Sequence, residues 1–440
     1  MKARARLGAR SARPATLIYG FAHYGKSLFW YGSELLFAFF LTEVGGIAAD
    51  RMGFVIAAGL LVSAGIDVAV GSRLSRVLPS AARAGRVQLV GAASSAASML
   101  LMFACYWLPV QVRLPAALGV SLVFRVSYAL FDIPQNSLMS LATDTVKART
   151  NLASVRYIFS GLASLTVATW LPRLLQPGTA DDRALRFCVM ALAFSAVAIV
   201  SAAMLARALK TDHSDNRLGN VLSKQSAALN DEIRLLLFLM FIISLAAPVF
   251  SKVEPYYAAF VLRDPLMGGG VVVAVSIGMI AAQPIWSLLA RRLSRSTLIG
   301  TTAAGIALAA TAFLFARACG SAALIVTALL FGAASGGVGM AMWAAYGDAV
   351  SQHAPRREAW AFGLFTAAAK VSLAVSGLSL GLLLARIDYR GADRGILLSV
   401  MVVPSIIAGG LALALLSWRH LRGASRAINS SLPEEGRLER

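Results

Sequence analysis

Twelve apolar windows of about 20 residues, the length that an α-helix needs to cross a bilayer, follow one another along this chain. They lie at roughly 15–41, 52–74, 87–107, 114–141, 151–175, 187–206, 235–262, 269–290, 297–317, 322–346, 359–385 and 396–418. A polar stretch from Lys210 to Glu232 separates the first six windows from the last six. The pattern predicts an all-α polytopic membrane protein with twelve transmembrane helices in two six-helix halves.

The distribution of basic residues predicts how such a protein sits in the membrane. The side that carries both termini holds 26 Lys and Arg residues in its loops and tails, whereas the opposite side holds 10. Cytoplasmic loops carry this excess in membrane proteins, so we expect both termini in the cytoplasm. The expected segments are a tail at 1–14, a first half at 15–207, a linker at 208–233, a second half at 234–418 and a tail at 419–440.

Composition excludes several other classes of protein. An apolar content of 58% and a mean hydropathy of +0.71 are too high for a soluble multidomain chain. The net charge of +20 comes from arginines that punctuate apolar runs, so topology explains it better than nucleic-acid binding does. We expect a monomer whose partners are the lipid bilayer and a small-molecule solute. The Ala- and Arg-rich, Lys-poor composition favours a bacterial inner membrane.

No motif indicates a cofactor, a metal or ATP. Cys105, Cys188 and Cys319 fall within or at the ends of the windows, without a CxxC pair or a His cluster, so we expect inert packing residues. The sequence also contains no G-x-x-x-x-G-K-[ST] loop. These observations favour a protein that is not an enzyme and that works without a cofactor or ATP.

Ionisable residues inside the windows follow a three-fold rhythm. They are absent from the interiors of windows three, six, nine and twelve, and they occur as Lys26, Glu34, Asp67, Arg125, Asp132, Arg156, Lys252, Glu254 and Lys370. A lipid-facing helix cannot hold a charge, whereas a helix that lines a polar cavity can. The rhythm therefore predicts the major facilitator fold, with a central cavity.

Asp132 is the strongest candidate for a functional charge, because it lies near mid-membrane depth beside Pro134. Arg125 is seven residues earlier and shares its helix face, and Ser27 and Glu34 have the same spacing on the first helix. A solute between these two polar stripes would meet both. The alternative, that such residues form buried ion pairs holding the helices together, stays open, above all for Lys26, Lys252 and Glu254.

An internal repeat supports the two halves. The sequence R-L-S-R follows the second window and recurs after the eighth, which gives Arg73 and Arg76 the counterparts Arg292 and Arg295. We expect these four arginines to act in conformational gating. The alternative reading is the general enrichment of basic residues at helix ends.

The segment YALFDIPQNSLMSLATDTVKARTNLASVR resembles the fourth-helix signature of the glycoside-pentoside-hexuronide cation symporters, the melibiose-permease-like branch of the major facilitator superfamily. Looser matches extend from about Tyr19 to Leu384: YGFAHYGKS, VEPYYAAFVLRDP, AAYGDAV and EAWAFGLFTAAAKVSLA. The resemblance implies that Asp132 binds sugar hydroxyls beside Arg156. Two positions of the expected sugar site depart from the family pattern, since Ser27 replaces a sugar-binding acid and Asn136 replaces an aromatic platform. The expected substrate-binding residues are Asp132, Arg156, Arg125, Ser27, Glu34, Asn136 and Tyr128.

The resemblance also implies an ion-coupling site. Asp67 matches the first of two acids in the second helix, and Lys370 matches the lysine of the eleventh helix that faces them. Gly71 stands in place of the second acid, and Ala129 in place of a nearby hydroxyl. A hard cation needs several oxygen ligands, so these departures favour coupling to protons, or no coupling, over coupling to sodium.

Together these observations predict a secondary active transporter that works by alternating access. The expected cargo is a polar organic solute, namely a sugar, a glycoside or a carboxylated sugar. Two alternatives stay open. One is a carrier of amphipathic lipids, because lysolipid carriers resemble the same branch, and the other is a receptor or biogenesis factor that no longer transports.

Overall fold

The computed structural model describes residues 13–77, 80–143, 145–176, 178–210, 230–354 and 357–431. These residues form helices and the short connections between them. In chain order the helices are α1 (Arg13–Tyr31), η2 (Gly32–Leu36), α2 (Phe37–Glu43), α3 (Ala49–Val77), α4 (Ala81–Ala104), η3 (Cys105–Trp107), α5 (Val110–Leu141), α6 (Val146–Leu175), α7 (Ala180–Ala208), α8 (Asp231–Tyr256), η5 (Tyr257–Leu262), α9 (Pro265–Ala281), α10 (Gln283–Leu289), α11 (Arg295–Ala316), η6 (Arg317–Cys319), α12 (Ser321–His353), α13 (Glu358–Leu384) and α14 (Ile396–Ser431). Most of the expected linker and most of the N-terminal tail lie outside the described residues, and α14 continues into the expected C-terminal tail.

Eleven helical segments of the described chain are long and apolar enough to cross a membrane. The first expected span is present as the continuous segment α1–η2–α2, but it is less apolar because its interior carries His23, Lys26 and Glu34. All three side chains are buried, and α1 packs between α6 and α7. The protein is therefore an all-helical, multi-pass membrane protein whose most polar span lies inside the bundle.

A π-helical segment interrupts the first helix of each half. The segment η2 follows α1, and η5 follows α8 at the corresponding place in the second half. Segments of this kind are rare and frequently mark functional sites. The two halves therefore share a π-helical segment at corresponding positions, which the sequence pattern did not reveal.

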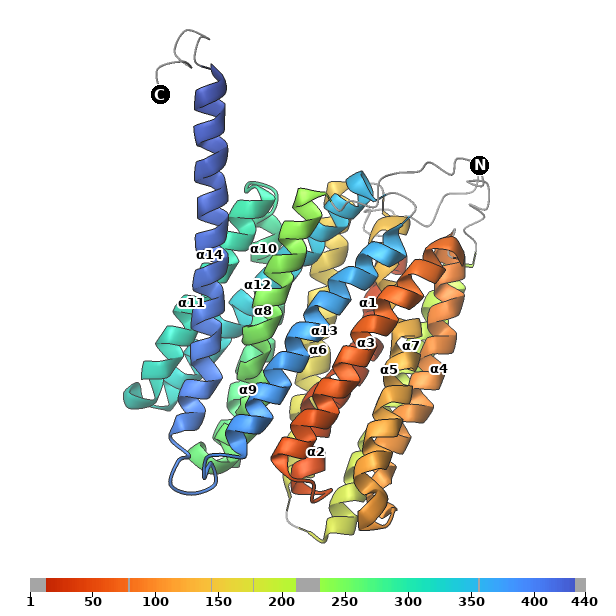
Figure 1. The fold of residues 1–440 in the computed structure, drawn as a ribbon, viewed down its shortest axis with the longest axis vertical. Coiled ribbons are helices and arrows are strands. Elements are labelled where there is room, and N and C mark those ends of the chain that lie inside the picture. The colour runs from red at the N-terminus through yellow and green to blue at the C-terminus, as the bar shows by residue number, and fades with distance from the viewer. Residues whose placement is uncertain are drawn as a thin grey trace.

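The two halves of the bundle meet along paired helices. Figure 1 shows α3 and α13 side by side, and α6 packs against α9 and α12. Glycines permit the close approach of α3 and α13, because a Cβ atom on Gly53 would lie 3.2 Å from the Cα atom of Gly381. Membrane helices associate through such small residues because lipid tails provide no hydrophobic drive between helices.

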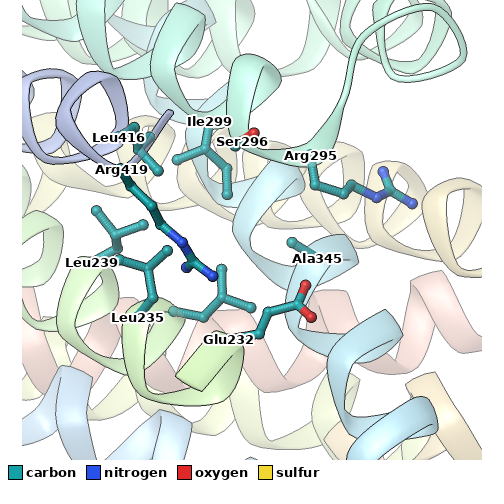
Figure 2. A pocket seen from close by; sticks show the side chains of 10 residues that line it. Glu232, Leu235, Leu239, Arg295, Ser296, Ile299, Ala345, Leu416 and Arg419 are labelled. Atoms are coloured by element: carbon teal, nitrogen blue, oxygen red, sulfur yellow. The ribbon is translucent and has the colours of Figure 1, made fainter. Parts of the chain in front are cut away.

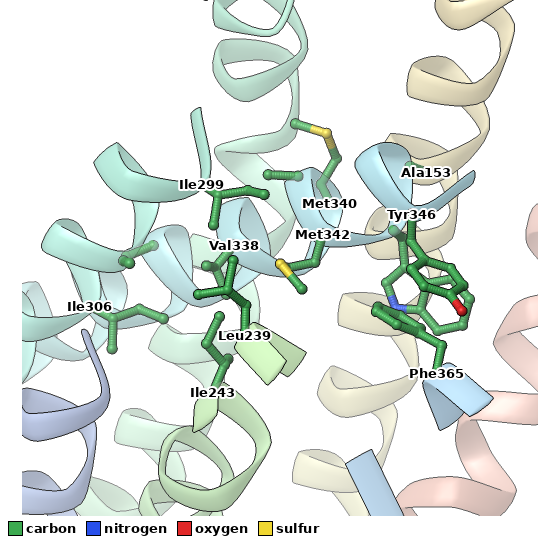
Figure 3. Close-up of a cluster of buried hydrophobic side chains, with 14 of the residues drawn as sticks. Ala153, Leu239, Ile243, Ile299, Ile306, Val338, Met340, Met342, Tyr346 and Phe365 are labelled. Atoms are coloured by element: carbon green, nitrogen blue, oxygen red, sulfur yellow. The ribbon is translucent and has the colours of Figure 1, made fainter. Parts of the chain in front are cut away.

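Buried apolar side chains form two clusters, one mainly in the first half and one that fills the second half and extends into the first. Figure 3 shows the core of the second half, where Leu239 and Ile243 from α8 lie near Val338 and Met342 from α12. This core continues across the interface to Ala153 of the first half. Cys105 is buried as expected, but Cys319 is exposed at the end of η6, so the packing role expected for it is wrong.

The orientation of the bundle stays a prediction that labelling can test. Cysteines introduced at Ser214, in the expected cytoplasmic linker, and at Gln111, at the start of α5, are expected to react with an impermeant thiol reagent from opposite sides of sealed vesicles. The reason is the excess of basic residues on the side that carries the termini. Labelling of both positions from the same side would contradict this topology.

Candidate functional site

A polar stripe along α5 organises the candidate site. Arg125, Tyr128, Asp132 and Asn136 are spaced by three or four residues, so they share one face of the helix. All four side chains are buried. The stripe extends over about 16 Å, given the rise of about 1.5 Å per residue in an α-helix. Each of its members meets a polar or charged partner from another helix.

Asp132 forms a buried ion pair with Lys26 of α1. The distance from the lysine Nζ to Asp132 Oδ1 is 2.8 Å, and only 2% and 8% of the two side chains are exposed. Lys26 also donates a hydrogen bond to Asn136 Oδ1 at 2.8 Å. The sequence left open a structural role for Lys26 in a buried ion pair, and the structure places it in contact with the central acid. Removal of one partner from a buried ion pair lowers the stability of the folded protein by about 3 to 5 kcal/mol.

Arg156 of α6 completes this polar cluster and connects it to the second half. Its Nη1 donates to Asn136 Oδ1 at 2.7 Å, and its guanidinium lies 3.5 Å from the ring centroid of Trp343. Trp343 comes from α12, so the contact crosses the interface between the halves. Trp343 was not among the residues expected at the site. It is the single tryptophan of α12, a helix made mostly of small and apolar residues, and that exception could have indicated a role at the site.

Smaller polar contacts surround this cluster. Ser27 of α1 contacts Ser160 of α6 at 3.1 Å between the hydroxyl oxygens, and the His23 ring lies 3.4 Å from Gln135 Oε1. Ser27 therefore points toward α6 beside the cluster. The cluster of Lys26, Asp132, Asn136, Arg156 and Trp343 is called the central cluster below.

The expected coupling residues form a second buried pair. Asp67 of α3 lies 2.6 Å from Lys370 of α13, measured between Oδ2 and Nζ, and both side chains are at most 2% exposed. The lysine Nζ also lies 5.8 Å from the centroid of the Tyr128 ring. Since α3 and α13 belong to different halves, this ion pair crosses the interface. Tyr128 precedes Asp132 by four residues on the same face of α5, so the pair lies close to the central cluster.

Gly71 shows why a second acid is missing from this pair. A Cβ atom at Gly71 would lie 2.6 Å from the carbonyl oxygen of Ala359 on α13. Backbone cannot move aside as a flexible side chain does, so neither a carboxylate nor a methyl group fits here without separating the two helices. The position expected to hold a sodium ligand is used for helix packing instead.

Gly71→Ala is therefore expected to lower the melting temperature of the purified protein. Overpacking of a close interface costs about 1 to 3 kcal/mol. Gly65→Ala is the matched control, because Gly65 is on the same helix and a Cβ atom there would have no neighbour within 4 Å, and alanine favours the helix. Equal melting temperatures for the two variants, measured by thermal unfolding in detergent, would contradict this account.

A third pair lies at the other end of the α5 stripe. Arg125 Nη1 lies 2.5 Å from Glu34 Oε1, and both side chains are buried. Arg125 and Glu34, expected on two stripes facing a solute, contact each other directly. For Lys252 and Glu254 of α8 the sequence left open a role in buried ion pairs. Among the described residues neither forms one, and Lys252 Nζ and Glu254 Oε1 are buried without a hydrogen-bond partner.

A charged network closes one end of the interface between the halves. Asp348 of α12 accepts hydrogen bonds from Arg149 of α6 at 2.6 Å and from Arg295 at 2.7 Å. Arg295 also donates to the hydroxyl of Thr150 at 2.9 Å. Of the four arginines expected to act in gating, Arg295 joins this network. Arg73 and Arg292 are exposed, and the side chain of Arg76 lies outside the described residues.

The opposite end of the interface is bridged by a weaker contact. Arg390, in the connection between α13 and α14, lies 2.9 Å from Glu43 at the end of α2. The arginine side chain is 56% exposed, so this pair is worth at most about 1 kcal/mol. Contacts between the halves thus occur at both ends of the bundle and at its centre.

Comparisons with known proteins agree with this architecture. The chain is similar to a bacterial homologue of the iron transporter ferroportin in an outward-facing state, with a TM-score of 0.65 and 13% identity over 93% of this chain and 100% of that chain. The same homologue with soaked iron gives the same values. At this identity the likeness shows the fold alone. No curated protein matches the sequence.

The sequence itself matches a family. The family model for MFS/sugar transport proteins covers residues 18–418, which includes every helix that contributes to the central cluster and to the Asp67–Lys370 pair. This span agrees with the resemblance seen from Tyr19 to Leu384. The chain therefore belongs to the MFS/sugar transport protein family, the melibiose-permease-like branch of the major facilitator transporters.

Proposed function

We propose that this transporter carries a carboxylated sugar, or a similar hydroxylated organic anion, by alternating access around the central cluster. The observation that supports the anion is the charge of the cluster. It holds two basic side chains, Lys26 and Arg156, and one acidic side chain, Asp132. Among the described residues Arg156 forms no ion pair with an acid, so one positive charge stays available for a substrate.

The geometry of the cluster suits such a solute. A guanidinium can bind a carboxylate through two parallel hydrogen bonds. Arg156 donates one hydrogen bond to the amide oxygen of Asn136, so its guanidinium has further donors for a carboxylate. Asp132 supplies an acceptor for sugar hydroxyls, and the Nδ2 of Asn136, which has no hydrogen-bond partner among the described residues, supplies a donor. Trp343 supplies an apolar face from the second half. Binding at a junction of the two halves allows the solute to bias their arrangement.

A thermal-shift screen of the purified protein tests the substrate class. A hexuronate is expected to raise the melting temperature, because a ligand that binds only the folded state stabilises it. The matching neutral hexose is expected to have a smaller effect. Arg156→Gln is expected to remove the difference between the two, whereas the control Arg394→Gln, at an exposed position between α13 and α14, keeps it. Equal stabilisation by hexose and hexuronate would contradict the proposed anion.

Counterflow in proteoliposomes separates a carrier from the alternatives. Exchange of labelled hexuronate supports transport, whereas binding without exchange supports a receptor on the same scaffold. A lysolipid that competes with the hexuronate for exchange would support the lipid carrier instead. The expected result is exchange of the hexuronate that a lysolipid does not inhibit.

The Asp67–Lys370 pair leads to a prediction about coupling. Uptake is expected to respond to an imposed pH gradient or to no ion gradient, since one carboxylate can carry a proton while sodium needs several oxygen ligands. Asp67→Asn is expected to abolish any pH dependence of uptake and to leave exchange intact. Asp50→Asn, at the exposed start of α3, is the control that keeps the wild-type pH profile. Stimulation of uptake by a sodium gradient at fixed pH and clamped voltage would contradict this prediction.

A further inference from the structure

A cavity at the end of the second half lies apart from the central cluster. It has a volume of about 500 Å³ and opens between α8, α11, α12 and α14. Its apolar lining comes mainly from five side chains, namely Leu235, Leu236, Leu239, Ile299 and Leu416. Figure 2 shows Arg419 of α14 extending across this cavity from the side of Leu416. The cavity thus combines an apolar floor with a cation at its mouth.

The cavity lies where the helices leave the apolar part of the membrane. Phe238 of α8 and Leu411 of α14, one to two turns deeper, are each 53% exposed on the outside of the bundle, as lipid-facing residues are. Trp418 precedes Arg419 and is 51% exposed. Tryptophan is enriched at the level of lipid headgroups. A molecule in this cavity would therefore have its apolar part at acyl-chain depth and its polar part at headgroup depth.

The charges at the mouth favour an anionic headgroup. Arg419 is exposed, and the start of α11 brings Ser296 and the positive end of a 22-residue helix to the same cavity. The guanidinium of Arg295 is held by Asp348, and Glu232 lies 3.4 Å from His353 through its Oε2. Arg419 is thus the lining cation that no carboxylate holds within 4.0 Å in the described part of the chain.

We propose that this cavity binds one anionic phospholipid of the adjacent leaflet. The phosphate contacts Arg419 and the N-terminus of α11, and an acyl chain occupies the leucine-lined floor between α8 and α14. Basic pockets between membrane helices recognise anionic lipids in this way. Because Arg295 lines the same cavity and holds Asp348, the bound lipid also steadies the end of α11 that takes part in the charged network between the halves.

Thermal unfolding of the full chain in detergent–lipid mixed micelles tests the proposal, with native mass spectrometry to count retained lipids. Phosphatidylglycerol is expected to raise the melting temperature more than phosphatidylcholine with the same acyl chains. Arg419→Gln is expected to weaken the apparent affinity for phosphatidylglycerol about fivefold, which corresponds to about 1 kcal/mol per basic residue near the surface. Arg419→Lys keeps most of the affinity, because it retains the charge.

Two further variants separate the site from general charge effects. Arg317→Gln, at the exposed opposite end of α11, is expected to leave the lipid effect unchanged. Leu235→Trp fills the floor and is expected to abolish the preference for phosphatidylglycerol although Arg419 is retained. Equal stabilisation by phosphatidylcholine, an unchanged affinity in Arg419→Gln, or the same stabilisation by inorganic phosphate alone would each overturn the proposal.

Discussion

Asp132→Asn is expected to weaken solute binding by at least about 30-fold and to abolish transport, while a folded protein can still be purified. Removal of one partner from a buried, hydrogen-bonded charge pair costs about 2 to 5 kcal/mol. Asp132 is the acid of the central cluster, and its loss leaves Lys26 with the amide oxygen of Asn136 as a hydrogen-bond acceptor. Ligand-induced shifts in melting temperature measure binding, and counterflow measures transport.

A double variant distinguishes recognition of the solute from simple neutralisation of Lys26. Replacement of a whole buried ion pair by neutral groups is often neutral or stabilising, so Lys26→Met combined with Asp132→Asn is expected to regain the melting temperature that the single variant loses. It is not expected to regain binding. Glu254→Gln is the matched control, because Glu254 is a buried acid outside the central cluster. Transport by the double variant would exclude a substrate role for Asp132.

Asp348→Asn is expected to open the end of the interface that its carboxylate closes. The variant weakens charged hydrogen bonds to Arg149 and Arg295, each of which is worth about 1.5 to 3 kcal/mol. The fraction of molecules in which the two halves are separated at this end is therefore expected to rise by at least about tenfold. The alkylation rate of a cysteine introduced at Ser154, a buried position that contacts Ser287 across the interface, reports this opening.

The opposite end of the bundle provides the control for this variant. Glu43→Gln removes the carboxylate that faces Arg390, but that pair is largely exposed and contributes at most about 1 kcal/mol. Its effect on Ser154→Cys alkylation is expected to be small and opposite in sign. An unchanged alkylation rate in Asp348→Asn would show that apolar packing, rather than the charged network, closes this end.

Much of the fold was predictable from residue spacing. The length of each apolar window follows from the thickness of the bilayer. The first span was also predicted, although it is the least apolar of the twelve. Its polar residues lower its hydropathy because it lies inside the bundle, where protein can surround them.

The site was predictable in part. Helical periodicity placed Arg125 and Asp132 on one face of α5, and the family resemblance placed Lys370 opposite Asp67. The sequence did not show that Asp132 meets Lys26 while Arg125 meets Glu34. Those partners depend on the rotation and depth of α1 relative to α5, and neither quantity is encoded in the period of a single helix.

The contacts between the halves were the part of the structure that the sequence predicted least. Trp343 and Asp348 lie in α12, almost 200 residues from the arginines of α6 that they meet. The sequence showed that each helix carries a polar or aromatic residue at a given depth. It did not show which helix of the other half would stand opposite, because that pairing results from the packing of all twelve spans together.

Gly71 illustrates the same division. The identity of residue 71 shows that this position carries no oxygen ligand, and hence that a sodium site built as in the family is incomplete. The cause is visible in the packing of α3 against α13, since the backbone of Ala359 occupies the space that a side chain would need. Local sequence determines which chemical groups a helix offers, whereas the distance between two helices decides which of those groups have room to act.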